Sequence, residues 1–159
     1  MRIPRIYMET TLFNFYVDED RGFAYESTIK LFDEIAAGRY TAYTSAVVIE
    51  ELAKAPLEKY EKMSSLILQY NISILALNDE ADRLADVYVA EGIIPLKYRI
   101  DGLHIAIATV YDLEMIISMN FQHIVKRKTI LTTAKINSLN GYRAIEIYSP
   151  MEVIEDENT

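Results

Sequence analysis

The chain has 159 residues, of which 51% are hydrophobic and 25% charged, as in an ordinary globular domain. It contains no cysteine, which excludes disulfide scaffolds and thiolate metal sites. The formal net charge is −8 at pH 7, which argues against a protein that coats itself with nucleic acid, because phosphate binding depends on lysine and arginine. We find no signal peptide and no apolar run long enough to span a bilayer, so we expect a cytoplasmic protein with no membrane segment.

Hydrophobic periodicity predicts strands that alternate with helices. In chain order, the predicted elements are a strand over 5–9, a helix from Thr10, a helix over 26–38, a strand over 41–44, helices over 45–55 and 57–70, a strand over 72–77, helices over 78–92 and 101–113, a strand over 114–118, a helix over 128–141 and a strand over 144–149.

End signals support these boundaries. Ser27 or Thr28 is expected to cap the helix over 26–38, and Ser45 begins the helix that follows the second strand. Asn78 is a good cap for the helix over 78–92, and Pro150 starts a final turn.

Alternating strands and helices predict an α/β domain with a mainly parallel central sheet flanked by helices. We expect one domain over residues 1–154 and a short acidic tail over 155–159. In such sheets the ligand site lies outside the carboxyl ends of the strands.

Polar residues gather where these strands should end. Glu9 closes the first strand, Ser118 and Asn120 follow the fourth, Glu51 lies in the helix after the second, and Asp101 lies at the start of a helix. Carboxylate and amide oxygens suit a hard divalent cation, Mg²⁺ or Mn²⁺.

Other interpretations stand beside this one. Asp101 is equally explained as a helix cap or as a favourable charge at the helix N-terminus. Glu50, next to Glu51, is better explained as part of a solvated face. Glu9 is harder to explain without a partner, because burying a carboxylate at a strand end is costly.

Four motifs, in order along the chain, resemble those of PIN domains of the VapC-like branch. They are IYMETTLFNFY, TSAVVIEEL with a serine six positions before a glutamate, DGLHIAIA, and SMNF with a hydroxyl residue two positions before an amide. The last strand, within GYRAIEIYSPMEVI, is similar too, so the resemblance extends over nearly the whole chain.

The resemblance implies a PIN-like α/β/α sandwich and a metal-dependent endoribonuclease, similar to the toxins of type II toxin–antitoxin modules. Carried over by position, Glu9, Glu51 and Asp101 are ligands of Mg²⁺ or Mn²⁺ and Asn120 supports them. Ser118 would orient a ligand or a water in catalysis. The implied partners are an RNA substrate, an antitoxin protein and a second copy of the chain in a homodimer.

Two positions depart from the family pattern. The first motif usually carries aspartate where this chain has Glu9, which is one methylene longer. The fourth usually carries aspartate where this chain has Asn120, whose amide oxygen ligates without charge. These departures favour one well-held cation, and they support an alternative function: a PIN-fold binding or scaffold module with weak or absent catalysis.

A third hypothesis is a small-molecule phosphohydrolase, although no D-x-D nucleophile motif follows the first strand.

Further residues have weaker claims on the site. Thr10 would present its backbone or hydroxyl, and His123 would contact phosphate with Lys126 and Arg127. His104 is either a packed histidine or a group that assists the site.

The other cationic and aromatic residues near these motifs also have two interpretations, one functional and one structural. Lys97, Arg99 and Lys128 are either part of the same basic rim or ordinary solvated residues. Leu12, Phe13 and Tyr16 are candidates for an interface patch.

Overall fold

The computed structural model describes residues 2–155. Within these residues the strands are β1 (Arg5–Met8), β2 (Thr41–Ser45), β3 (Ser73–Leu75), β4 (Met115–Ile117) and β5 (Glu146–Tyr148). The helices are α1 (Thr10–Tyr16), α2 (Phe23–Ala36), α3 (Ala46–Leu52), α4 (Leu57–Gln69), α5 (Asp79–Ala90), α6 (Arg99–Val110), α7 (Arg127–Leu139) and α8 (Pro150–Val153), with 3₁₀ turns at Glu19–Arg21 and Leu96–Tyr98.

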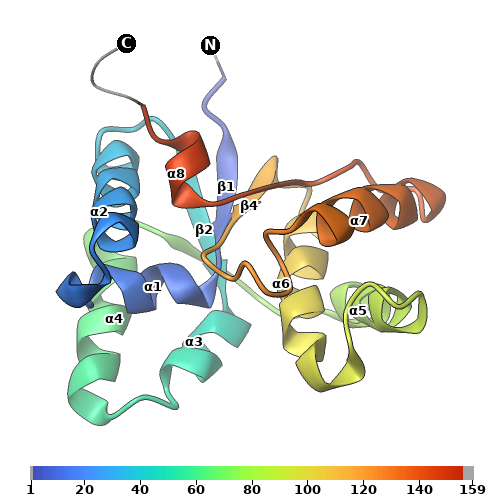
Figure 1. The fold of residues 1–159 in the computed structure, drawn as a ribbon, viewed down its shortest axis with the longest axis horizontal. Helices are drawn as coiled ribbons and strands as arrows, with labels where there is room; N and C mark the ends of the chain where they lie inside the picture. Colours follow the sequence, from blue (N-terminus) through green and yellow to red (C-terminus); the bar gives the residue numbers. More distant parts are fainter. Residues whose placement is uncertain (1, 156–159) are drawn as a thin grey trace.

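The strands form one sheet in the order β3-β2-β1-β4-β5, and every neighbouring pair is parallel. The first strand is therefore central, with β2 on one side and β4 on the other. Figure 1 shows α1, α2 and α4 on one side of the sheet and α5, α6 and α7 on the other. The α/β class and the mainly parallel sheet predicted from the sequence are confirmed.

The helix α2 begins earlier than the pattern predicted. It starts at Phe23, directly after Gly22, whose φ of 58° turns the chain without a side-chain cap. The prediction that Ser27 or Thr28 caps this helix is wrong, because both residues are buried inside it. The Thr28 hydroxyl donates to the carbonyl of Ala24 (2.8 Å) one turn back.

The helix α6 also begins early, at Arg99 rather than at residue 101. The Arg99 guanidinium bridges to Asp82 (3.1 Å) and Asp86 (2.8 Å) of α5, and this pairing holds the first turn of α6 against that helix. Asp101 thus lies inside the first turn rather than at the cap, which is Tyr98.

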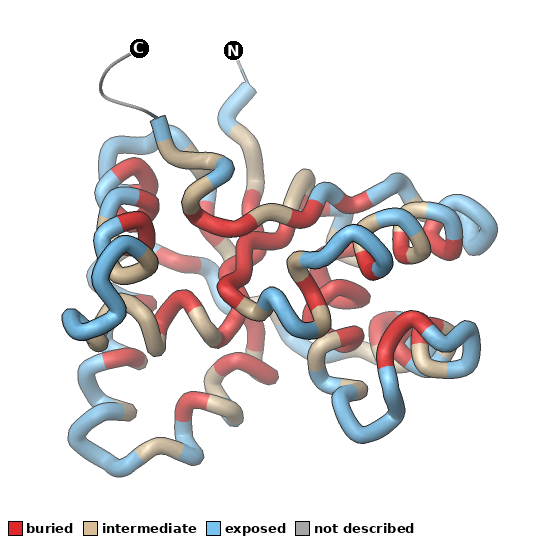
Figure 2. Tube along the Cα trace, in the orientation of Figure 1, coloured by how far each residue is buried: buried red, intermediate tan, exposed pale blue. Residues whose placement is uncertain are grey.

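The hydrophobic core lies on both faces of the sheet. Figure 2 shows buried backbone running through the central strands and exposed residues on the outer turns. The central strands β1 and β4 are accordingly rich in buried apolar residues, whereas the edge strand β3 is largely exposed. Leu12 and Phe13 are fully buried in this core, so their proposed part in a surface patch is wrong; Tyr16, half-buried beside them, bonds Tyr70 through its hydroxyl (2.6 Å).

At the C-terminal end, the backbone N–H of Glu155 donates to Glu34 Oε2 (2.9 Å), and the Glu155 carboxylate pairs with Arg39 (2.6 Å). The rest of the expected acidic tail, residues 156–159, lies outside the described residues. Among residues 2–155, no helix combines the length and the apolar character needed to cross a lipid bilayer.

The core predicts a contrast between two leucines that both lie on helices. Leu31 on α2 has no exposed surface, whereas Leu68 on α4 is 89% exposed. We expect Leu31→Ala to lower the free energy of unfolding by about 2–5 kcal/mol, and Leu68→Ala to change it by less than about 0.5 kcal/mol. Urea unfolding followed by circular dichroism measures both. Equal losses in the two variants would contradict this assignment of the core.

Candidate active site

The parallel sheet brings the predicted site residues to one edge. Glu9 follows β1 directly and caps α1, while Ser118 and Asn120 follow β4, the neighbouring strand. Glu51 comes from α3, which leaves β2 on the other side of β1. Asp101 comes from the first turn of α6. Adjacent parallel strands end at the same edge, and this explains why residues far apart in the sequence meet here.

Glu9 is almost fully buried and is held by one of its two oxygens. Its Oε1 accepts from the Thr11 backbone N–H (3.1 Å), the Thr11 hydroxyl (2.5 Å) and the Ser118 hydroxyl (2.7 Å). The Thr11 hydroxyl in turn accepts from the N–H of Met119 (2.8 Å), and the Ser118 hydroxyl from the N–H of Asn120 (2.9 Å). Ser118 therefore orients Glu9, one of the candidate metal ligands.

Glu51 is held in a similar way. Its Oε1 accepts from the Thr10 hydroxyl (2.6 Å) and meets His104 Nε2 at 2.5 Å. Glu50, the neighbouring residue, is exposed. Like the motif spacing, these contacts select Glu51 rather than Glu50 as the site residue. Thr10 contacts the site through its hydroxyl.

Asp101 contacts the loop that follows β4. Its Oδ2 lies 3.0 Å from His123 Nδ1, and the His123 ring stacks on Tyr98 with centroids 4.1 Å apart and planes inclined by 31°. The Asn120 amide oxygen accepts from the His123 backbone N–H (3.0 Å). Asn120 therefore already uses its ligating atom to shape the loop that carries His123.

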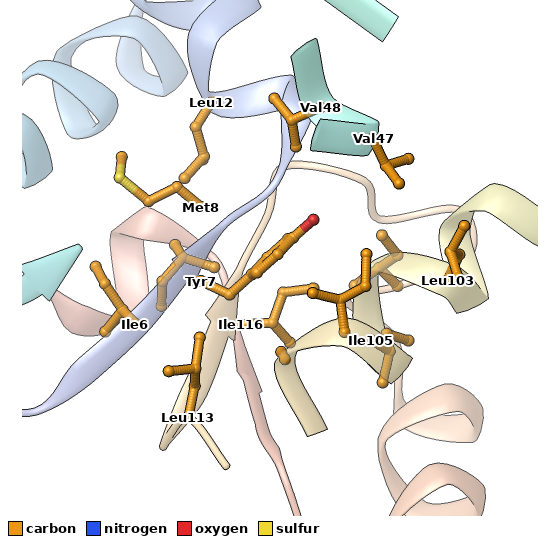
Figure 3. Packing of buried hydrophobic residues seen from close by; sticks show 14 of the residues in the cluster. Ile6, Tyr7, Met8, Leu12, Val47, Val48, Leu103, Ile105, Leu113 and Ile116 are labelled. Atoms are coloured by element: carbon orange, nitrogen blue, oxygen red, sulfur yellow. The ribbon is translucent and has the colours of Figure 1, made fainter. Parts of the chain in front are cut away.

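His104 lies under the carboxylates with no exposed surface. Its Nδ1 is 2.6 Å from the Tyr7 hydroxyl, which is 2.7 Å from Ser45 Oγ. Figure 3 shows the Tyr7 ring extending from β1 into the core, with its hydroxyl directed away from that strand. His104 is a packed histidine, as one of the two interpretations held, and one of its partners is the candidate ligand Glu51.

Burial and His104 set the protonation of the carboxylates. Burial raises the pKa of Glu9 and of Asp101, and the nearby His104 charge offsets this rise only in part. Burial also acts to raise the pKa of Glu51, but the hydrogen bond and charge of His104 lower it overall. Burial would lower the pKa of His104, yet the bond to Glu51 and the charges of all three carboxylates raise it. His104 is therefore electrostatically coupled to all three acids.

The donor set suits a hard cation. Among residues 2–155, no group of three acidic or histidine side chains is already gathered as a metal-ligand cluster. Glu9 and Glu51, however, receive their hydrogen bonds on Oε1 alone, which leaves Oε2 of each for another partner. Among the described residues, two fully buried side-chain polar atoms have no hydrogen-bond partner, Ser27 Oγ and Thr133 Oγ1. The Oε2 atoms of Glu9 and Glu51 are not among them, so these unbonded oxygens retain some exposed surface. Oxygen ligands held by hydrogen bonds through their other atom are typical of metal sites.

The basic residues divide into two groups. Arg99 is paired with α5 and does not serve a phosphate rim. The Lys97 ammonium lies over the Tyr98 ring, 5.7 Å from its centroid. Lys126 and Arg127 are exposed at the start of α7, and within residues 2–155 neither forms an ion pair. Lys128, the next residue, is exposed as well and forms no ion pair within the described residues, so all three cationic side chains are available beside the loop of His123.

Sequence reasoning missed several residues that support the acids. Thr11 bonds Glu9, Tyr7 bonds His104, and Ser45 bonds the hydroxyl of Tyr7. One signal was available for Tyr7: it precedes Glu9 by two positions, and residues two apart lie on the same face of a strand.

Comparison with known proteins identifies the fold. No model of a known protein family matches the chain, and no curated protein matches it. Among solved structures, a chain of VapBC2 from Rickettsia felis, bound to a DNA fragment from its promoter, superimposes with a TM-score of 0.60 and 10% identity over 91% of this chain and 98% of that one. VapC20 from Mycobacterium tuberculosis, a sarcin–ricin-loop-cleaving toxin, superimposes with a TM-score of 0.58 and 10% identity, over 89% of this chain and 98% of that one.

Both neighbours are VapC-type PIN-domain structures, so the PIN-like fold implied by the sequence motifs is confirmed.

Burial of the Glu9 carboxylate predicts that the free energy of unfolding depends on pH. Because the pKa of Glu9 is higher in the folded protein than in the unfolded chain, folding takes up a proton between the two values, and stability falls as pH rises through the folded-state pKa. Glutamine stays neutral and keeps the oxygen that accepts from Thr11 and Ser118. In EDTA, we expect Glu9→Gln to unfold at higher urea concentration than wild type at pH 8, and the difference to shrink toward pH 4.

Glu50→Gln is the matched control, because it removes the same charge from an exposed position. It should change the free energy of unfolding by less than about 0.5 kcal/mol at either pH. If Glu9→Gln is less stable than wild type at pH 8, the prediction is wrong, and the hydrogen bonds of the ionised Glu9 carboxylate outweigh the cost of burying its charge.

Proposed function

We propose that this chain is a PIN-type, metal-dependent endoribonuclease and the toxin of a type II toxin–antitoxin module. The observation that carries the proposal is the bond between Glu51 and the buried His104, whose charge is also coupled to Glu9 and Asp101. The three acids lie toward the carboxyl ends of the strands, in a fold shared with VapC20, which is described as cleaving the sarcin–ricin loop.

Glu9, Glu51 and Asp101 are the proposed ligands of Mg²⁺ or Mn²⁺, and Asn120 supports them. A bound divalent cation supplies Lewis acidity, which activates water and neutralises charge on a phosphodiester. Ser118 and Thr11 hold Glu9, and Thr10 and His104 hold Glu51, so that each glutamate keeps one oxygen free for the cation.

The RNA backbone is proposed to lie along the loop after β4 and the start of α7. Lys126 and Arg127 are exposed there, and His123, within this loop, contacts Asp101. Phosphate contacts of this kind position a nucleic acid without reading its sequence. A local basic rim also reconciles RNA binding with the net charge of −8.

The proposed partners are an antitoxin protein and a second copy of the chain in a homodimer, and the proposed location is the cytoplasm. The antitoxin is supported by the fold shared with the VapBC2 complex.

A PIN-fold scaffold with weak or absent catalysis is the second candidate. One observation favours it: the described residues hold no ready-made ligand cluster. Tight binding of a divalent cation separates the two functions, because a scaffold does not need it.

Neighbouring glutamates provide the test. We expect Glu51→Gln to weaken Mn²⁺ binding by more than about 100-fold, beyond the loss typical of residues that only support a ligand. Asp101→Asn should do the same. Glu50→Gln, one position away and exposed, should bind Mn²⁺ as wild type does. Calorimetry measures the affinity, and cleavage of a labelled RNA of mixed sequence is assayed on the same samples.

Loss of Mn²⁺ binding and of cleavage in Glu51→Gln and Asp101→Asn, but not in Glu50→Gln, supports a catalytic metal site. If wild type binds no Mn²⁺ at millimolar concentration and cuts no RNA, the nuclease proposal fails. In that case the scaffold candidate replaces it. If wild type binds Mn²⁺ and cuts nothing, the metal site stands and the ribonuclease activity does not.

A further inference from the structure

A continuous chain of hydrogen bonds runs beneath the candidate site. It joins Ser45 Oγ to the Tyr7 hydroxyl (2.7 Å), Tyr7 to His104 Nδ1 (2.6 Å), and His104 Nε2 to Glu51 Oε1 (2.5 Å). Ser45, Tyr7 and His104 all have no exposed surface. The geometry points to His104 as a positioning residue that fixes the direction in which Glu51 presents its free oxygen to a divalent cation. This inference rests on the proposed function.

The direction of the last bond follows from the donors and acceptors available. An ionised carboxylate only accepts, so the proton between Glu51 and His104 belongs to Nε2. The Tyr7 hydroxyl can donate to Nδ1 or accept from it. Nε2 therefore carries a proton whether or not Nδ1 does, and the bond to Glu51 Oε1 is kept in both forms of the imidazole.

The chain is anchored on the three elements that supply the carboxylates. Tyr7 lies on β1, two residues before Glu9, and His104 lies on α6, three residues after Asp101. Ser45 caps α3, the helix of Glu51, and accepts from the N–H of Val48 (3.3 Å) at the first turn of that helix. Because the links between Ser45, Tyr7 and His104 are buried, the chain fixes the distances between these three elements as well as the orientation of the Glu51 side chain.

Glu51 Oε1 is consequently held from two sides. The Thr10 hydroxyl reaches it from α1 and His104 reaches it from α6. Rotation of the carboxylate would break at least one of these bonds, so Oε2 keeps a fixed direction. Supporting bonds of this kind typically change metal affinity by about 10- to 100-fold.

Three variants test the inference by Mn²⁺ calorimetry and by RNA cleavage at saturating Mn²⁺. His104→Phe fills the space without a donor and should weaken Mn²⁺ binding by about 10- to 100-fold. It should lower kcat and leave KM for a labelled RNA of mixed sequence unchanged. His104→Gln places an amide N–H near the position of Nε2 and should restore most of the affinity. Tyr7→Phe removes only the hydroxyl and should weaken binding about fivefold, the effect of one neutral hydrogen bond.

Tyr88→Phe is the matched control. Tyr88 is also a tyrosine with no exposed surface, and its hydroxyl bonds Asn137 of α7, which in turn bonds Thr109, so the hydroxyl makes no bond to a candidate ligand or to His104. It should lose stability as Tyr7→Phe does and bind Mn²⁺ as wild type does. Thermal unfolding shows whether each variant is folded. If His104→Phe does not fold, the Mn²⁺ affinities of Tyr7→Phe and Tyr88→Phe are compared instead.

Two results would overturn the inference while the proposed function stands: His104→Phe, or Tyr7→Phe in its place, binds Mn²⁺ as tightly as wild type, or Tyr88→Phe loses as much affinity as Tyr7→Phe. If wild type binds no Mn²⁺ and cuts no RNA, the proposed function and this inference are both wrong.

Discussion

The candidate site depends on holding three carboxylates near one another against their mutual repulsion and the cost of burial. An ionised carboxylate taken out of water is strongly destabilising unless it finds donors or an opposite charge. Glu9 and Glu51 find hydroxyl and N–H donors, and His104 lies within electrostatic range of all three acids. A central strand with a parallel neighbour on each side makes this arrangement possible, because consecutive crossovers return the chain to one edge.

The strands were predictable from the sequence, because short runs of apolar and β-branched residues stand between helical patterns and turn residues. Helix ends were predictable where a local signal sets them, as Ser45 does for α3. The predicted helix starts were wrong where the backbone conformation of a glycine or a contact with another helix sets the boundary. The start of α2 depends on the positive φ of Gly22, and the start of α6 depends on a pairing between Arg99 and Asp82 on another helix. Tertiary pairings of this kind leave no periodic signal in one sequence.

The motif spacing nominated Glu9, Glu51 and Asp101, since their positions relative to the strand ends can be read along the chain. Their supporting partners could not be read in the same way. His104 meets Tyr7 across 97 positions and Glu51 across 53. Which hydroxyl faces which carboxylate depends on how helices on both faces approach the sheet, and a single sequence does not state those distances.

The contacts of Glu9 also have a mechanical consequence. Its Oε1 is tied to Thr11 at the start of α1 and to Ser118 at the end of β4, and the same two hydroxyls receive the N–H groups of Met119 and Asn120. The loop that follows β4 and the first helix therefore move as one body with the carboxylate between them. A displacement of this loop would have to break these bonds or carry Glu9 with it, so the position of the carboxylate depends on the position of the loop.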